Sequence, residues 1–591
     1  MSQETNDSPT TCLCSNVACQ CPIEVLRDLA MQALQLASRE DVSDERLRFF
    51  PRESVLREIS PEFVRKVLRK VPNTNVDIAE GLHRATNRVC PRGDCCCKRP
   101  LCTGNRIVFV SLLFTGLHNI LGQFLHAAQL EYCDSSLWGL SQNVLTFGGE
   151  NPIFRDIQRL NGDQKQLFLY WAHQLRALCF LKEGDDAQVR KLGPEDGVEN
   201  RVRLPWTSIE SPVRSSGGES HQGANKPQVI DMQSSRVQKI YIHRSHHKLD
   251  ESTNRFALKT FLDGYSPGSS QKNFDLELET NNAIRRHDRI LALLAALEHR
   301  GNFYMIFPWA EFGNLRGIWE EYSPRVDGAT GPNVRHAEWY SSQWILEQCL
   351  GIASAVAYIH GRGGLRQFLL HADITPVNIL GFPNQHSVFL KLADFGHSHI
   401  LDPDSLQVPV SALVKPRTYR APEWDTKENV TTQYDVWSLG CLFLEFATWA
   451  ISGREGIKAF ENERLSEDND PKADYGSCPE DTFFKRVAGR RSILSGSRFH
   501  RSYMLTTHRN DSKSSFTRSR SFSVHGFNRP VVTQIREAVV AHIQDLRNKP
   551  ECNDDCGKRA WSDEVRDALS RILSKGLELE ANHVGTDRAD N

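Results

Sequence analysis

The sequence has almost no net charge and no long apolar run. Its 72 lysines and arginines balance 73 aspartates and glutamates, which leaves a formal net charge of −1. This balance gives no electrostatic reason to expect a nucleic acid or an anionic membrane as a partner. The hydrophobic fraction of 39% is ordinary for a soluble globular protein, and 591 residues are enough for several domains.

Segments that would direct the chain to a membrane are also lacking. No charged stretch precedes an apolar core near the first residue, so we expect no signal peptide. The most apolar stretch, Ile107 to Leu117, is too short to span a bilayer and is interpreted as a buried strand or helix. We therefore expect a cytoplasmic protein, with the nucleus as the alternative, and no membrane partner.

The 16 cysteines lack a regular metal-binding spacing. Two groups stand out, which are Cys12, Cys14, Cys19 and Cys21, and then Cys90, Cys95, Cys96, Cys97 and Cys102. Zinc sites favour thiolate pairs two to four residues apart, whereas the first group has C-x-C pairs and the second has three consecutive cysteines. Zinc stays open as an alternative, and we favour reduced thiols in disordered or surface-loop segments.

The first 202 residues show helical periodicity but no catalytic constellation. Residues 1–22 are polar and Cys-rich, which is typical of disorder. Apolar residues then recur at helical spacing in three stretches, Ile23–Leu36, Pro61–Val71 and Gln164–Phe180. Ser60 is a suitable N-cap for the second stretch. The pattern predicts a mostly helical N-terminal domain over 23–185 and a linker over 186–202.

Two motifs in the second half of the chain carry chemistry. The residues from His371 to Asn378 form an H-x-D-x-x-x-x-N element, and the sequence Asp-Phe-Gly begins further on at Asp394. Phosphoryl transfer needs a positioned hydroxyl and metal-neutralised phosphates, with little covalent help from the protein. Asp373 can accept the hydroxyl proton, while Asn378 and Asp394 can hold Mg²⁺.

With these motifs in this order, residues 203–591 resemble the eukaryotic protein kinase family. The resemblance implies an α+β, bilobal fold, with a small β-rich lobe and a large helical lobe after the helical N-terminal domain. The N-terminal part is similar to regions found beside kinase-like domains in fungal proteins. The implied cofactors are ATP and Mg²⁺, and the implied substrate is a protein.

The resemblance extends to the nucleotide-binding residues of the small lobe. Phe256-Ala-Leu-Lys259 resembles the strand whose lysine grips the phosphates. The expected carboxylate partner of Lys259 is Glu277, with Glu279 as the alternative. The stretch from Met305 resembles the last strand and the hinge that binds adenine, which implies that the cofactor contacts Phe307, Trp309 and Ala310.

The sequence departs from the family pattern at the phosphate-binding loop. The family has G-x-G-x-x-G before a strand that corresponds here to Val237–His243, since glycine lets backbone N–H groups close over phosphates. The preceding residues, 231–236, contain no glycine. Asp231 would instead bring a carboxylate near the phosphates, so this departure weakens the expected ATP affinity.

Further departures lie near the catalytic loop. Ala372 stands where the family has the arginine that receives an activation-segment phosphate, so activity should not need that phosphorylation. Thr375 replaces a lysine that neutralises the transferring phosphate. Pro416 replaces a threonine that touches this lysine, and Thr418 is a candidate substitute.

The remaining large-lobe motifs concern the fold. Asp435 resembles the aspartate that holds the backbone of the catalytic loop, a structural role. Glu423, in an A-P-E motif, needs a cation when buried, and Arg588 is its expected partner. Residues 484–529 are rich in Ser and Arg and are interpreted as a disordered insertion. Helices are expected on its far side, at 531–546 and 562–577.

Two functions compete on these residues. A Ser/Thr protein kinase is favoured because Lys259, Glu277, Asp373, Asn378 and Asp394 are all present and the marks of a tyrosine kinase are absent. A pseudokinase that acts as a signalling scaffold or binding module is the alternative, because the glycines and the catalytic-loop lysine are missing. A third, weaker interpretation makes the N-terminal domain the functional part, regulated by the kinase-like half.

Overall fold

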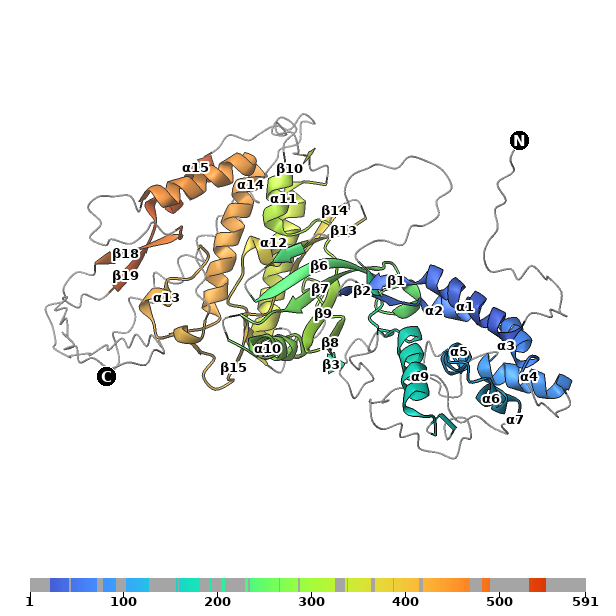
Figure 1. Ribbon diagram of the computed structural model, residues 1–591. Coiled ribbons are helices and arrows are strands. Elements are labelled where there is room, and N and C mark those ends of the chain that lie inside the picture. Colours follow the sequence, from blue (N-terminus) through green and yellow to red (C-terminus); the bar gives the residue numbers. More distant parts are fainter. Residues whose placement is uncertain are drawn as a thin grey trace, which may run out of the picture. The chain divides into compact units, whose positions relative to one another are not determined.

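The computed structural model falls into two compact units, here named unit 1 and unit 2 (Figure 1). Unit 1 comprises Met1–Gly313, Leu380–Pro383 and Lys391–Gly396, and unit 2 comprises Asn314–Ile379, Asn384–Leu390 and His397–Asn591. The described residues are 22–41, 44–71, 78–91, 103–126, 156–157, 159–180, 189, 191–192, 203–207, 229–231, 234–264, 266–284, 287–324, 335–336, 339–362, 367–385, 387–413, 418–467, 481–488 and 531–548.

The first part of unit 1 is mostly helical. Its elements are α1 (Ile23–Ala37), β1 (Arg39–Asp41), β2 (Asp44–Phe49), α2 (Arg52–Glu58), α3 (Pro61–Leu68), α4 (Ile78–Val89), α5 (Arg106–Phe114), α6 (His118–Leu121), α7 (Gln123–His126) and α9 (Gly162–Leu175). The helices predicted from Ile23 and Pro61 are both present. The side chain of Ser60 accepts a hydrogen bond from the Phe63 amide at 3.2 Å, so it is the N-cap of α3.

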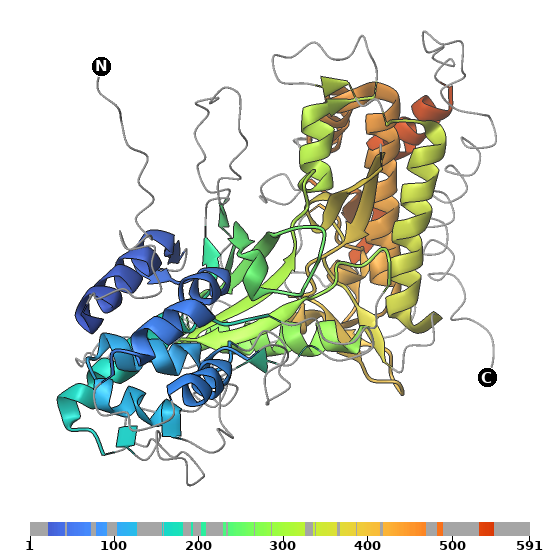
Figure 2. The ribbon, with the colours of Figure 1, turned by 90° about the vertical axis from the view of Figure 1, so that its right-hand side faces the viewer.

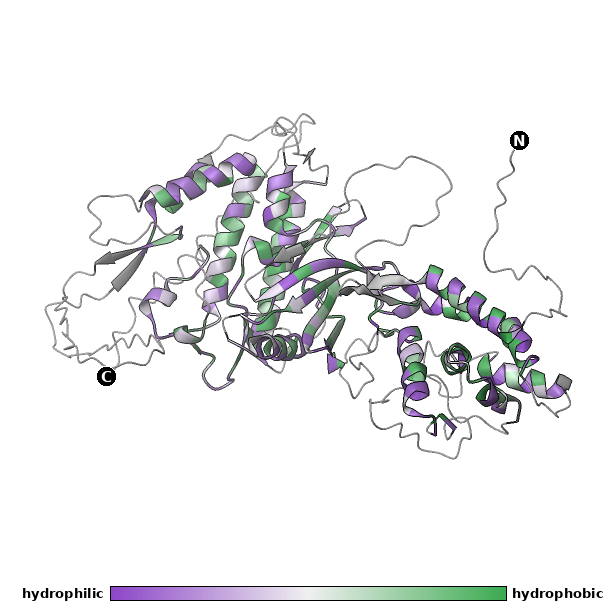
Figure 3. Cartoon of the chain, viewed as in Figure 1, coloured by the Kyte–Doolittle hydropathy of each residue, from purple (hydrophilic) through white to green (hydrophobic). Residues whose placement is uncertain are grey.

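Helix α5 forms the centre of this part. All residues from Ile107 to Phe114 are buried, and hydropathy colouring shows the helix as predominantly hydrophobic (Figure 3). A helix that is apolar on all sides belongs in a core, which decides between the strand and the helix that the sequence left open. Buried residues of α1, α3, α4 and α9 join the same cluster. A separate domain with the bounds 23–185 stays a prediction.

Unit 1 also contains a seven-stranded sheet of order β3-β8-β9-β7-β6-β4, in which β5 pairs with β6. Its strands are β3 (Lys191–Leu192), β4 (Trp206–Thr207), β5 (Val229–Asp231), β6 (Ser235–Ile242), β7 (Arg255–Phe261), β8 (Ala295–His299) and β9 (Asn302–Pro308). Strand β7 runs antiparallel to both neighbours, and Lys259 pairs with Val237 on one side and Met305 on the other. The sheet thus fixes the backbone of Lys259 from both sides.

Helix α10 (Ser269–Ala283) packs on this sheet through one aromatic residue. The ring of Phe274, which is fully buried, lies 5.4 Å from Phe261 and 5.3 Å from Phe303. Helical residues three apart share a face. The packing of Phe274 therefore also turns Glu277 towards the sheet.

Unit 2 is mainly helical, and its long helices α12 and α14 lie side by side (Figure 2). Its helices are α11 (Leu315–Glu321), α12 (Ser342–Ala357), α13 (Glu423–Thr426), α14 (Gln433–Ser466) and α15 (Glu537–Asn548). Its strand pairs are β10 (Tyr322–Ser323) with β11 (Arg335–His336), β12 (Phe368–Leu370) with β15 (His399–Leu401), and β16 (Val408–Pro409) with β17 (Asn429–Val430). Strands β13 (Ile379–Asn384) and β14 (Ser387–Leu392), which pair with each other, each contain residues assigned to unit 1 and residues assigned to unit 2. The buried helix predicted from Trp344 is α12.

Helix α14 is the longest helix in the described part of the chain, and it contains Asp435, as the family resemblance implied. By length and composition it is long enough to cross a membrane, but 67% of its most apolar stretch is buried inside the structure. It is also kinked at Gly453, where φ is 63°. Such burial is typical of a core helix.

Two predicted boundaries near the end of the chain differ from those in the structure. Residues at the start of the proposed disordered insertion form β18 (Phe484–Ala488), which pairs antiparallel with β19 (Val531–Ile535). The side chain of Phe484 is buried, which anchors the strand, and β-branched Val531 and Val532 favour a strand over the predicted helix. The helix begins only at Glu537.

Several predictions lie outside the described residues. They concern residues 489–529, the helix over 562–577, and all of the singled-out cysteines except Cys90. Cys90 is buried and forms no disulfide, and its thiol donates to the Ile59 carbonyl at 3.5 Å.

Candidate active site

In unit 1, Lys259 of β7 bridges two carboxylates. Its Nζ donates to both oxygens of Glu277, at 2.8 and 2.7 Å, and to Oδ1 of Asp394 at 2.9 Å. The side chains of Lys259 and Glu277 are only 9% and 2% exposed, whereas that of Asp394 is 24% exposed. A buried ion pair joined to a more open carboxylate has the polarity of a cation-binding or phosphate-binding site.

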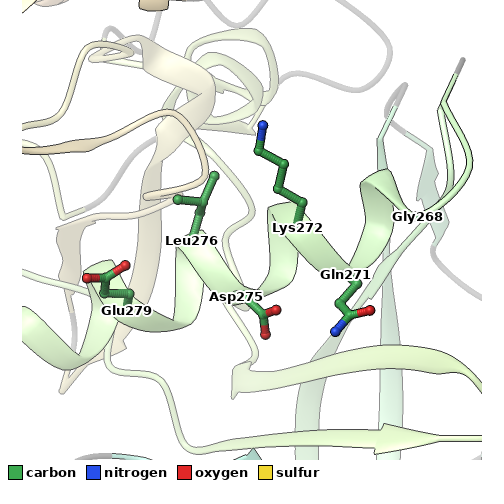
Figure 4. Close-up of a pocket in the computed structure, with 6 residues that line it drawn as sticks. All are labelled: Gly268, Gln271, Lys272, Asp275, Leu276 and Glu279. Carbon is green, nitrogen blue, oxygen red and sulfur yellow. The ribbon is translucent and has the colours of Figure 1, made fainter.

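The structure distinguishes between the two candidate partners of Lys259. Glu277 is on the sheet-facing side of α10, whereas Glu279 is exposed. Glu279 lines an open hollow of about 450 Å³ on the outer side of the helix, with Lys272, Asp275 and Leu276 (Figure 4). Glu279 is therefore not the partner of Lys259.

Lys259, Glu277 and Asp394, here called the triad, carry two carboxylates for one ammonium. Burial alone would lower the pKa of Lys259, but attraction by Asp394 and Glu277 outweighs it and raises the pKa above its ordinary value. Burial raises the pKa of Glu277 to about 7, opposed by Lys259 and assisted by the carboxylate of Asp394. One ammonium thus neutralises two carboxylates incompletely, which favours an additional cation at the more exposed one.

Asp394 is held in an unusual backbone conformation. Its φ is 63°, in the left-handed region that few non-glycine residues adopt, and its Oδ1 accepts a hydrogen bond from the Gly396 amide at 3.2 Å. A Cβ at position 396 would lie 2.9 Å from a Glu277 oxygen and 3.2 Å from Asp394 Oδ1. Glycine at 396 thus lets the backbone pass close to the triad.

The predicted adenine-binding residues follow β9. Phe307 is buried in the strand, while Trp309 and Ala310 are partly exposed just after it. The Nζ of Lys239, on β6, lies 5.1 Å from the centre of the Trp309 ring. The sequence analysis missed Lys239, because nothing local in the sequence links β6 to the end of β9.

The glycine-free loop is a short hairpin connection. Asp231 at the end of β5 pairs with Arg236 near the start of β6. Residues 232–233 between them lie outside the described part of the chain. The strand predicted from Val237 is present as part of β6.

In unit 2, Asn378 is bound directly to Asp373. Its Nδ2 donates to the backbone oxygen and to Oδ2 of Asp373, both at 2.8 Å. The amide nitrogen is thereby committed to Asp373, so the amide oxygen is the end left to act as a metal ligand. This orientation fits the predicted role of Asn378.

Asp435 anchors the same loop from α14. Its carboxylate accepts the amides of His371 at 2.8 Å and Ala372 at 2.9 Å, and its Oδ2 lies 2.9 Å from His360 Nε2. Ala372 has a φ of 64° and is buried. The fully buried Asp435 stabilises this left-handed conformation, in agreement with the structural role predicted for it.

Three departures from the family pattern can be located. The Thr375 hydroxyl is buried and has no hydrogen-bond partner in the described part of the chain. Thr418 does not substitute for the missing threonine as suggested, because its hydroxyl donates to Asp481 at 3.2 Å. Pro416 lies outside the described residues.

Glu423, at the start of α13, is buried as predicted. Its Oε2 has no hydrogen-bond partner among the described residues. Its proposed partner, Arg588, lies outside them, so that pairing stays a prediction.

The donors present fit Mg²⁺ by their chemistry. In unit 1 Asp394 offers a carboxylate, and in unit 2 Asn378 offers an amide oxygen, each considered by itself. Mg²⁺ in phosphoryl-transfer sites is held by one or two carboxylates together with substrate phosphates. No group of three or more His, Cys, Asp or Glu residues that could hold a metal occurs in the described part of the chain. The residues therefore suit a metal that arrives with a nucleotide.

Comparison with known proteins shows similarity to protein kinases. Residues 245–467 match the family described as "Protein kinase domain". Rat 3-phosphoinositide-dependent protein kinase 1 is 32% identical over 105 residues, which are 18% of this chain and 17% of that protein. A probable receptor-like protein kinase of Arabidopsis thaliana is 29% identical over 175 residues, 29% of this chain and 18% of the relative.

A G-type lectin S-receptor-like serine/threonine-protein kinase of Arabidopsis thaliana is 27% identical over 227 residues, 38% of this chain and 24% of the relative. The matched segments thus span less than a quarter of these relatives. Residues 245–467 of the chain are a protein kinase domain, and its relatives include serine/threonine protein kinases.

Proposed function

We propose that this protein transfers the γ-phosphate of ATP to serine or threonine hydroxyls of a protein substrate. The observation that carries the proposal is the bridging of Glu277 and Asp394 by Lys259 in unit 1. In unit 2, the Asp373–Asn378 pair adds a base and a metal ligand. The proposal includes the bilobal arrangement and a cytoplasmic or nuclear location.

Each residue has a definite task in this reaction. Lys259 binds phosphate oxygens, and Glu277 keeps its ammonium oriented. Asp373 accepts the proton of the substrate hydroxyl. Asn378 and Asp394 would hold Mg²⁺, which neutralises the charge of the phosphates when bound.

The adenine would lie at the hinge beside Phe307, Trp309 and Ala310. Lys239, close to the Trp309 ring, offers a positive charge that the glycine-free loop does not. Threonine stands at position 375, where the family has lysine. This difference lowers the rate without abolishing transfer, because removal of one electrostatic donor typically costs about 10²–10³ in rate.

A pseudokinase that serves as a scaffold is the second candidate. The observation that favours it is the absence of glycine between β5 and β6, together with the Thr375 hydroxyl, which has no hydrogen-bond partner among the described residues. Such a protein would keep the folded arrangement of these residues without productive nucleotide binding.

A thermal-shift titration with ATP separates the two candidates. A ligand at about 100 times its dissociation constant stabilises the folded protein by about 2.7 kcal/mol, which raises the melting temperature by a few degrees. We expect this rise with Mg²⁺ present and its loss in Asp394→Ala. No rise for the unmodified protein at millimolar ATP would favour the scaffold.

A further inference from the structure

A buried arginine in unit 2 joins two carboxylates that come from different segments. Arg464, near the end of α14, donates from Nη2 to Glu445 at 3.0 Å and from Nε to Asp481 at 2.7 Å. The side chains of Arg464 and Glu445 are each 1% exposed. We call these three residues the Arg464 clamp.

Aromatic rings enclose the guanidinium of the clamp. Its central carbon lies 4.3 Å from the ring centre of Phe460 and 4.4 Å from that of Phe483. A planar guanidinium can stack on rings while it bonds carboxylates at its edge, which lysine cannot do. The clamp is thus specific for arginine.

Each of the two carboxylates also accepts a hydrogen bond from one of two consecutive residues. Glu445 accepts from the phenol of Tyr419, and Asp481 accepts from the hydroxyl of Thr418 at 3.2 Å. Burial raises the pKa of Tyr419 well above its ordinary value, so the phenol keeps the proton that it donates. The clamp therefore holds both residues that precede the Arg420-Ala-Pro-Glu423 segment.

In many protein kinases the activation segment is ordered by a phosphate that pairs with arginine. Here alanine stands at position 372, where the arginine of the catalytic loop would be. We propose that Arg464 is a positioning residue, which holds the segment that begins at Thr418 in a fixed conformation without phosphorylation. This inference rests on the proposed function, because it states how the substrate-facing segment of that site is kept in order.

Hydrogen–deuterium exchange of the full chain tests the clamp without requiring activity. After phosphatase treatment, backbone amides of residues 418–426 should exchange as slowly as before it. In Arg464→Met they should exchange at least about tenfold faster, since the variant leaves two carboxylates without their cation. Lys458→Met, an exposed change on the same helix (49% exposed), should leave the exchange unchanged.

Two milder variants cover the case in which Arg464→Met does not fold. Tyr419→Phe and Thr418→Val each remove one hydroxyl and should speed exchange of 418–426 about threefold. Unchanged exchange in both hydroxyl variants, unchanged exchange in a folded Arg464→Met, or faster exchange after phosphatase treatment alone would overturn the proposal.

The result is distinguishable from failure of the proposed function. The Mg²⁺-dependent thermal shift with ATP should persist in Arg464→Met, because Lys259, Glu277 and Asp394 belong to unit 1. With an active protein, the same variant should raise KM for the protein substrate while KM for ATP stays the same, whereas general unfolding would change both. An inactive protein with slow exchange at 418–426 would contradict the kinase but not the clamp.

Discussion

The ammonium of Lys259 lies 2.7 Å from Glu277 Oε2, in an ion pair that is almost completely buried. Lys259 is in β7 and Glu277 is in α10, so the ion pair fixes the helix against the sheet. Removing one member of a buried pair leaves an uncompensated charge. The pair therefore contributes to folding as well as to the proposed phosphate binding.

We predict that Lys259→Met lowers the free energy of unfolding by about 3–5 kcal/mol and abolishes the ATP-dependent thermal shift. The double variant Lys259→Met/Glu277→Gln should recover part of the stability but none of the shift. Denaturant unfolding measures the first effect. Lys272→Met, an exposed change on α10, is the control, and an equal loss there would refute the explanation.

Gly396 offers a test of the close approach in the triad. Gly396→Ala places a methyl group about 2.9 Å from the Glu277 carboxylate, so the carboxylate or the backbone has to move. We expect ATP affinity to fall at least about tenfold, about 1.4 kcal/mol. Isothermal titration calorimetry measures the affinity for ATP. Gly440→Ala has open space around its methyl group and should bind ATP normally.

Asp435→Asn should destabilise the catalytic loop. Both oxygens of Asp435 accept backbone N–H groups, from His371 and Ala372. In the asparagine variant the side-chain NH₂ group would face one of these donors and could not accept its hydrogen bond. We expect a loss of about 2–3 kcal/mol in the free energy of unfolding and a strong drop in phosphoryl transfer. Chemical denaturation shows the loss, and a variant as stable as the unmodified protein would contradict the anchoring role.

His246 links the helical part of unit 1 to its sheet and predicts a dependence on pH. Its Nε2 accepts the Arg52 amide at 2.7 Å, and its Nδ1 lies 3.1 Å from the Leu178 carbonyl, to which it must donate. The imidazole is therefore neutral. Burial above all, and then the charge of His243, lowers its pKa to about 3.

Because the folded pKa lies below the ordinary value of 6.5, the unfolded chain binds a proton that the folded chain does not. The stabilisation is complete above pH 6.5 and is lost as the pH falls towards 3, on the order of 5 kcal/mol in all. His246→Gln should flatten the dependence of unfolding free energy on pH in this window. His83→Gln, at an exposed position on α4, should not.

Motifs that resemble those of the protein kinase family were enough to predict part of the site. The resemblance implied the pairing of Lys259 with Glu277, and only the choice against Glu279 needed the structure. The bond between Asn378 and Asp373 lies within one loop. Such contacts depend on backbone geometry that short motifs specify.

Contacts between distant segments could not be predicted. Arg52 and His246 are separated by 194 residues, and neither lies in a recognisable motif. Arg464 and Asp481 lie in or near an acidic stretch that has the composition of a solvated surface, yet the clamp buries the arginine completely. At the chain end, the composition of the Ser- and Arg-rich segment obscured strand β18, which depends on pairing with β19 some 40 residues later.

The central claim is phosphoryl transfer, and its most direct test compares the unmodified protein with Asp373→Asn. Both are incubated with Mg²⁺ and ATP labelled at the γ-phosphate, together with a mixture of protein substrates. We predict transfer to serine and threonine, with a rate at least about 100-fold lower in Asp373→Asn, since a positioned base contributes about 10²–10⁴. Labelling by the unmodified protein that is no faster than that by Asp373→Asn would contradict the claim.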